Sequence, residues 1–415
     1  MNQLVTADVA WSSAGQAATE VLQDAATRDE VAHAWLFVGP PSVGQSEAVR
    51  ALAAALNCDA PVHGEGCGTC HACRLIGSGQ HPAVIDFAPE GRFHLVESVR
   101  TEWVPTATRT SLVGRTKILH VVGADRMNEA TQNAFLKVLE EPPASVIWIL
   151  DVEDESLLLE TVVSRCRRVD FRPWRLDRLE AAAASRGVGN PQAIARAATG
   201  SPRRLRQLTD ADVADTVAHR RAQGGKGSDD AALEELAERL SAAAARRRHL
   251  AILGRLADEG PAIVVPLARE LDAWAQARVE VRRADNEQEL ADLEERFRRD
   301  ERRIEWPPGL KKRVEQRHKR LEREERTGAL LSLLDELGSY LRDVLTVSGG
   351  GTEAGVVNLD VADDVRRDGA RVPTEVLVDG LAAISACRMA LQNNGNPVLQ
   401  LERLLMRVAL PLFEV

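Results

Sequence analysis

Four cysteines lie close together near the start of the chain, in the pattern C-x8-C-x2-C-x2-C. Thiolates at these spacings can surround one Zn²⁺ tetrahedrally, and four protein ligands leave no open position for catalysis. Glycines between the cysteines favour the tight turns of a metal knuckle. The sequence therefore predicts a structural zinc site, whose ligands are Cys58, Cys67, Cys70 and Cys73.

The cysteine cluster has alternative interpretations. An iron–sulfur cluster is also held by thiolates, but no electron-transfer motif accompanies these residues. His63 and His71 could each replace a cysteine, although four thiolates already complete the shell. The other two cysteines, Cys166 and Cys387, stand alone, and we expect them to be buried small side chains rather than reactive thiols.

A second motif is the loop G-P-P-S-V-G-Q-S at residues 39–46, between an apolar run and a helical pattern. This is the context of a phosphate-binding loop, G-x-x-x-x-G-K-[S/T], in which glycines let backbone amides approach phosphate. Gln45 replaces the lysine and carries no charge. We therefore expect a degenerate loop, in which Gly39, Gly44, Gln45 and Ser46 bind ATP weakly or not at all.

The acidic residues of an ATPase site are missing as well. Such sites end a buried strand with one acid for Mg²⁺ and another for the attacking water. After the corresponding strand, these two positions hold Val122 and Gly123, and Asp125 follows two residues later. We interpret Asp125 as a turn or capping residue, and we expect no ATP hydrolysis by this chain.

The composition excludes several classes of protein. The 415 residues are 44% apolar and 28% charged, which is typical of a globular chain of about two to four domains. The net charge of −9 excludes a protein that binds nucleic acid through overall charge, and 4% aromatic residues argue against base-stacking platforms. No apolar run is long enough to span a membrane, and no signal peptide is evident, so we expect a cytoplasmic protein.

The elements that would position these motifs can be predicted from local patterns. Runs rich in β-branched and aromatic residues predict buried strands at 35–38, 84–87, 117–122 and 146–150. Helical stretches between them include 47–56 and 128–139, the second ending before Pro142-Pro143. Alternating strands and helices predict a parallel α/β sheet within residues 1–172.

The rest of the chain is predicted to be helical. The composition of residues 173–220 predicts a small helical bundle, and that of residues 223–229 predicts a flexible linker. Asn396-Pro397 is a start signal for the last helix. One apolar face of that helix is expected to comprise Leu401, Leu404, Leu405 and Val408.

Residues 279–326 are unusually charged, with 14 acidic and 15 basic side chains among 48 residues. Thin apolar stripes flank the break Trp306-Pro307-Pro308-Gly309, a pattern typical of a coiled-coil hairpin. The stripes comprise Leu290, Leu293, Phe297 and Ile304, then Leu310, Val314 and Leu321. We interpret it as a solvated, salt-bridged arm; a docking or DNA-contacting arm is the alternative.

Taken in order, the motifs resemble one known family. The degenerate loop 39–46, the knuckle 58–73, the run N-A-F-L-K-V-L-E-E-P-P at 133–143 and S-R-C at 164–166 are similar to those of delta-prime subunits of the bacterial DNA polymerase III clamp loader. The resemblance covers residues from about 10 to 210. The gamma/tau ATPase subunits share these motifs, except for the degenerate loop.

The resemblance implies an AAA+ fold with three parts. These are a core with the degenerate loop and zinc knuckle at 1–172, a helical lid at 173–220, and a helical collar at 221–415 with the coiled-coil insertion at about 279–326. It also implies a hetero-pentamer with gamma/tau and delta subunits. The sliding clamp and, through the complex, primer-template DNA are the other expected partners.

By the same resemblance, the chain is a stator in a DNA polymerase holoenzyme and has no ATPase activity of its own. Arg165 of S-R-C would act as an arginine finger in a neighbouring gamma/tau site. Arg203, in a motif whose arginine senses nucleotide in active relatives, is expected to be a remnant or a packing residue. The alternatives are an ATP-binding motor subunit and a zinc-bearing interaction protein that keeps an AAA+ core.

Overall fold

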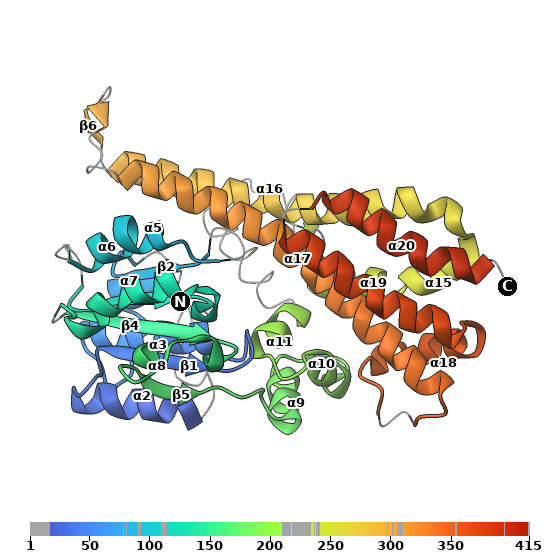
Figure 1. The fold of residues 1–415 in the computed structure, drawn as a ribbon, viewed down its shortest axis with the longest axis horizontal. Coiled ribbons are helices and arrows are strands. Elements are labelled where there is room, and N and C mark those ends of the chain that lie inside the picture. The colour runs from blue at the N-terminus through green and yellow to red at the C-terminus, as the bar shows by residue number, and fades with distance from the viewer. Residues whose placement is uncertain are drawn as a thin grey trace. The chain divides into compact units, whose positions relative to one another are not determined.

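The computed structural model describes residues 17–77, 79, 81–89, 93–108, 114–143, 145–209, 217, 234–235, 237, 241–296, 298–300, 303–304, 310–352, 355–393 and 395–413. The chain forms two compact units, Met1–Arg206 and Gln207–Val415 (Figure 1). The linker expected at 223–229 lies outside the described residues.

The first unit contains a five-stranded parallel sheet with the strand order β2-β3-β4-β1-β5. The strands are β1 (Ala34–Val38), β2 (Val84–Phe87), β3 (Lys117–Val121), β4 (Val146–Val152) and β5 (Arg167–Asp170). The four predicted strands are confirmed as β1 to β4, and the parallel pairing confirms the expected α/β core. Trp35 of β1 pairs with Ile149 of β4, which fixes the register at the centre of the sheet.

The fifth strand, β5, was not predicted from the sequence. It pairs with β1 at one edge of the sheet, and only Val169 among its four residues is buried. A strand that buries a single side chain leaves no apolar run in the sequence.

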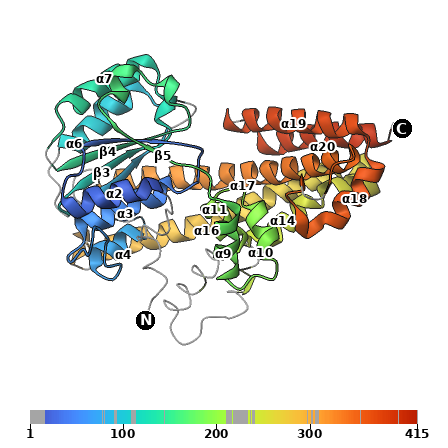
Figure 2. The ribbon, with the colours of Figure 1, turned by 90° about the horizontal axis from the view of Figure 1, so that it is seen from below.

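Helices cover both faces of the sheet, as Figure 2 shows, with α7 on one side and α2 and α3 on the other. The helices α2 (Ala17–Arg28) and α3 (Gln45–Asn57) pack on the face that includes Trp35 and Ile149. The helix α7 (Glu129–Glu140) packs on the opposite face, where Phe135 meets Trp148 at a ring separation of 4.8 Å. The two helices predicted from the sequence are therefore confirmed as α3 and α7.

Short elements complete the first unit. They are α4 (His71–Gly77), α5 (Val96–Ser98), the π-helical turn η2 (Val99–Trp103), α6 (Val104–Thr108), the 3₁₀ turns η3 (Ala124–Arg126) and η4 (Glu155–Leu157), α8 (Glu160–Val163), α9 (Leu176–Ala184), α10 (Pro191–Ala197) and α11 (Pro202–Leu208). The last three agree with the helical character expected after residue 172. The Asn190 side chain caps α10 by accepting the Ala193 amide.

The second unit is mainly helical, as expected. It comprises α14 (Ala242–Leu250), α15 (Ile252–Glu259), η5 (Pro261–Ile263), α16 (Val264–Arg296), α17 (Leu310–Ser348), η7 (Leu359–Val361), α18 (Ala362–Arg371), α19 (Thr374–Gln392) and α20 (Pro397–Phe413). The Asn396 side chain accepts the Leu399 amide at the start of α20, which confirms the predicted start signal.

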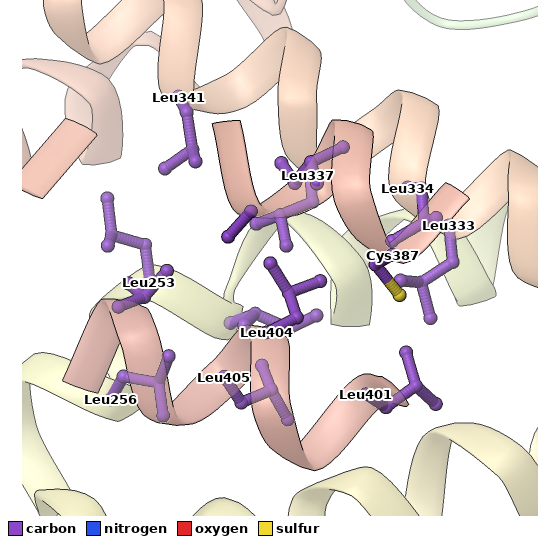
Figure 3. Close-up of a cluster of buried hydrophobic side chains, with 14 of the residues drawn as sticks. Leu253, Leu256, Leu333, Leu334, Leu337, Leu341, Cys387, Leu401, Leu404 and Leu405 are labelled. Atoms are coloured by element: carbon purple, nitrogen blue, oxygen red, sulfur yellow. The ribbon is translucent and has the colours of Figure 1, made fainter. Parts of the chain in front are cut away.

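The core of the second unit is a cluster of leucines contributed by several helices (Figure 3). Leu401, Leu404 and Leu405 of α20 point toward leucines of α15 and α17, and all three are buried. The predicted apolar face of the last helix is therefore confirmed. Cys387 of α19 is buried in the same cluster, as expected for a small core side chain.

The charged segment forms a helical hairpin, in which α16 and α17 lie side by side (Figures 1 and 2). Ion pairs join the two helices: Arg278 with Glu325 at 2.8 Å, and Lys311 with Glu294 at 3.3 Å. Between the helices, the strands β6 (Arg298–Asp300) and β7 (Arg303–Ile304) form a small antiparallel pair that was not predicted. The break at 306–309 lies outside the described residues.

Candidate functional site

The four predicted cysteine ligands come together between α3 and α4. Cys58 ends α3, Cys73 lies within α4, and all four sulfur atoms lie within 4.8 Å of one another. The sulfurs of Cys58 and Cys70 are 3.9 Å apart. Zinc–sulfur bonds of about 2.3 Å in a tetrahedral site place sulfurs at nearly this separation. The four side chains can therefore hold a metal ion.

Backbone amides point at the sulfur atoms and suit thiolate ligands. The amide of Cys67 donates to the sulfur of Cys58 at 3.2 Å, and the amide of Cys70 donates to the sulfur of Cys67 at 3.3 Å. Hydrogen bonds from the Thr69 hydroxyl and from this amide lower the pKa of Cys67 to about 6. Burial raises the pKa of Cys58 and Cys73. Metal binding would therefore deprotonate the buried thiols.

The close packing around the knuckle explains one of its glycines. A Cβ on Gly66 would lie 2.7 Å from the Cβ of Ala54 and 3.1 Å from the sulfur of Cys73. Only glycine allows the chain to pass between α3 and the cysteine cluster at this point.

The loop 39–46 joins β1 to α3, as the phosphate-loop pattern predicts, and Gly44 precedes the first turn of α3 with φ of 128°. Gly39 has a structural reason to be glycine that does not involve phosphate. A Cβ there would lie 2.2 Å from the carbonyl oxygen of Phe171, at the end of β5. The strand-to-helix turn is therefore maintained by packing within the chain.

Gln45 folds back into the loop instead of pointing outward. Its side chain is only 2% exposed. The side-chain oxygen accepts the Val43 amide at 3.1 Å, and the side-chain nitrogen donates to the Pro40 carbonyl at 2.6 Å. The amide of Val43, which a phosphate-binding loop would offer to an anion, is already satisfied by this neutral side chain.

The loop also contacts the segment after the sheet. The Ser201 hydroxyl donates to the Ser42 carbonyl at 2.7 Å, which ties the start of α11 to the loop. Arg203 lies exposed on α11.

The structure assigns a capping role to Asp125. Its carboxylate accepts the amides of Glu153 and Asp154 at 3.1 and 3.3 Å, and so holds the chain that leaves β4. Gly123 adopts the left-handed conformation with φ of 63°, which a side chain disfavours. An acidic residue at that position would be strained, so the turn after β3 is not built for the acid that would act on the attacking water.

A charged cluster near the loop was missed in the sequence analysis. Buried His120 of β3 bonds to Asp86 of the neighbouring strand β2 at 2.9 Å, and its other ring nitrogen lies 4.0 Å from Asp151 of β4. The sequence contained one sign of this cluster, since His120 interrupts the apolar run K-I-L-H-V-V at 117–122. Strand register was needed to place the two acids beside it.

Arg165 lies between α8 and β5, with its side chain 34% exposed. Its guanidinium donates to Glu140 at 2.7 Å and to the Thr161 carbonyl at 2.8 Å. The next residue, Cys166, packs against the core, and burial raises its pKa to about 12. The S-R-C motif thus fixes the backbone through the cysteine and leaves the arginine at the surface.

The region that holds these features is similar to subunits of DNA polymerase III. The family described as "DNA polymerase III, delta subunit" matches residues 15–175. DNA polymerase III subunit delta' of Pseudomonas aeruginosa is 36% identical over 141 residues, which are 34% of this chain and 43% of that protein. The Escherichia coli subunit delta' is 36% identical over 137 residues, which are 32% of this chain and 41% of that protein.

Other relatives are named as tau or gamma-related subunits of DNA polymerase III. DNA polymerase III subunit tau of Bacillus subtilis is 33% identical over 159 residues, covering 37% of this chain and 27% of that protein. A solved gamma subunit-related protein of Thermotoga maritima shares 15% identity with a TM-score of 0.40, covering 74% of this chain and 99% of that chain.

The chain spans less than half the length of the curated delta' relatives that it matches. The matched region contains the degenerate loop, the cysteine cluster and the S-R-C motif. Residues 15–175 are therefore similar to the delta' subunits of DNA polymerase III.

Proposed function

We propose that this chain is the non-hydrolysing stator of a DNA polymerase III clamp loader. It would donate Arg165 to the ATP site of a neighbouring gamma/tau subunit and help load the sliding clamp on primed DNA. The observation that carries this proposal is the buried side chain of Gln45, which satisfies the phosphate loop from within. A motor subunit would need a cation at that position.

The contacts of Gln45 disfavour nucleotide binding for two reasons. A phosphate would have to displace the side-chain oxygen of Gln45 from the Val43 amide, and it would meet no lysine. The hydrogen bond from Ser201 to Ser42 further restrains the loop. The positions of the two acids of an ATPase site hold Val122 and Gly123, which cannot bind Mg²⁺ through a side chain. The turn after β3 therefore contributes to packing but not to ATP hydrolysis.

Arg165 suits a role in trans because its side chain is partly exposed and its backbone is anchored. Phosphoryl transfer builds negative charge on the transferred group, and a guanidinium supplied by a neighbouring subunit stabilises that charge by about 10³–10⁵ in rate. In the single chain, the charge of Arg165 is matched by Glu140 across a solvent-exposed ion pair. This pair engages one N–H group of the guanidinium, so other N–H groups remain available to a phosphate.

The remaining parts follow the family pattern in this proposal. Residues 1–172 form the AAA+ core, 173–220 the lid and 221–415 the collar that assembles with gamma/tau and delta subunits. Zn²⁺ is the metal we propose for the cysteine cluster, and the α16–α17 hairpin is a salt-bridged coiled-coil arm. Among the described helices, none is both long and apolar enough to cross a membrane.

The test is the Arg165→Ala variant in the reconstituted clamp loader with clamp and primed DNA. We expect assembly to be unchanged and ATP hydrolysis at the neighbouring site to fall by about 10²-fold or more. Arg165→Lys should fail as well, because an ammonium lacks the planar fork of the guanidinium.

Arg203→Ala is the matched control, since Arg203 is an exposed arginine on α11 of the same unit. Steady-state ATPase rates of the complex provide the measurement. If Arg165→Ala hydrolyses ATP as fast as the wild-type complex, this chain donates no arginine finger.

A further inference from the structure

The Arg165 side chain is fixed at two points before any partner arrives. One terminal nitrogen donates to the Thr161 carbonyl at 2.8 Å, and the other donates to the Glu140 carboxylate at 2.7 Å. The Thr161 contact lies four residues back, on the same turn of chain. The Glu140 contact comes from a different helix and so fixes the direction in which the long side chain lies.

We propose that Glu140 is a positioning residue for Arg165. With the Thr161 carbonyl, it holds the plane of the guanidinium ready for a phosphate on a neighbouring subunit. This inference rests on the proposed function and adds a role for a residue that the sequence analysis quoted only as part of the L-E-E-P-P run.

Both anchors can remain in place while phosphate binds. A guanidinium carries five N–H groups, and the two contacts engage one on each terminal nitrogen. Three N–H groups are left, including the one on Nε. A phosphate can therefore be recognised through two of them without breaking the contact with Glu140.

Glu140 is itself well placed to orient another side chain. It is the last residue of α7, and its neighbours Val138 and Leu139 are buried in the core. The Glu141 amide closes the helix end by donating to the Lys137 carbonyl at 3.3 Å. The two prolines that follow prevent the helix from continuing. The carboxylate therefore stands on a rigid helix end rather than on a loop.

A competing role would be a latch that sequesters Arg165 from phosphate. The side chains of Arg165 and Glu140 are 34% and 50% exposed, and exposed ion pairs are weak. An ion pair of this kind would do little to keep the Arg165 guanidinium away from a phosphate. Arg165 has two separate partners, the neutral Thr161 carbonyl and the charged Glu140 carboxylate. Two partners favour a role in orienting the guanidinium over a role in sequestering it.

The test compares three variants in the reconstituted clamp loader with sliding clamp and primed DNA: Glu140→Ala, Glu140→Gln and Glu141→Ala. We expect Glu140→Ala to lower kcat for ATP by about tenfold with KM unchanged, because a misplaced guanidinium loses alignment with the reacting phosphate. Glu140→Gln should keep most of the rate, since its amide oxygen can accept the same hydrogen bond. Glu141→Ala should match the wild type, because Glu141 carries the same charge one residue further along.

Three results would overturn the inference or the proposal beneath it. Faster hydrolysis in both Glu140 variants would mean that the carboxylate is a latch. An unchanged rate in Glu140→Ala, with a reduced rate in Arg165→Ala, would leave the arginine finger standing and remove only the positioning role. An unchanged rate in Arg165→Ala would refute the proposed function itself. Co-elution of each variant with its partner subunits checks that assembly is intact.

Discussion

At the scale of single residues, the environment of His120 is the least ordinary feature near the degenerate loop. Burial alone would lower the pKa of His120, but the hydrogen bond to Asp86 and the charges of Asp86 and Asp151 outweigh it, so the pKa is raised. Arg50 of α3 acts in the opposite direction. Burial raises the pKa of Asp151 to about 6. The folded chain therefore favours the protonated form of both groups.

These shifts predict a pH dependence of local stability in β3. Because the folded pKa of His120 lies above 6.5, its contribution is complete below that pH and is lost as pH rises through the folded pKa. Ionisation of Asp151 between 3.8 and about 6 also costs stability. Amide exchange of β3, corrected for the intrinsic effect of pH, should therefore show protection that falls from pH 5 to 8.

The matched variant is His120→Asn, which can still bond to Asp86 but does not titrate. Above pH 6.5 its β3 protection should no longer decline with pH. Equal slopes for wild type and variant would mean that His120 does not control this dependence.

At the scale of elements, the cysteine cluster connects the end of α3 to α4. We expect about one zinc per chain by elemental analysis. Cys70→Ser should lose the metal and lower the thermal unfolding midpoint of the first unit by several degrees, because structural sites contribute directly to folding. A folded, fully reduced and metal-free preparation would contradict the zinc assignment.

Cys387→Ala is the matched control for the metal experiment. Because Cys387 lies in the leucine core of the second unit, the Cys387→Ala variant should retain its full zinc content. Chelator treatment of this variant should lower the midpoint as it does in the wild type, and Cys70→Ser should no longer respond to chelator.

How far the sequence could predict each element depended on burial. The central strands β1, β3 and β4 bury both faces and leave apolar runs, and Asn396-Pro397 marked the start of α20 through local capping. β5 could not be predicted, because an edge strand with one buried residue has no periodic signal.

The candidate site was predicted to a similar extent. The spacing of the cysteines was enough to predict that the four ligands lie together. The inward orientation of the Gln45 side chain and the ion pair of Arg165 with Glu140 could not be predicted, because they depend on tertiary contacts that no spacing encodes.

At the scale of the whole molecule, the two units would carry different functions. The first unit would supply Arg165 from a core that keeps the packing of a nucleotide-binding turn without its cation or acids. The second unit, with its leucine core and paired helices, would assemble with the gamma/tau and delta subunits. Several charges of the α16–α17 hairpin pair across its own helices, for example Arg326 with Asp272 at 2.8 Å, which favours a salt-bridged arm over a nucleic-acid contact.

The most direct test of this account is equilibrium binding of a slowly hydrolysed, fluorescent ATP analogue, with Mg²⁺, to the isolated chain. Because Gln45 already satisfies the loop, we predict a dissociation constant weaker than about 1 mM, or less than about 4 kcal/mol of binding free energy. Micromolar binding would contradict the account, since it would show that the loop still cradles phosphate and that the chain responds to nucleotide as a motor subunit does.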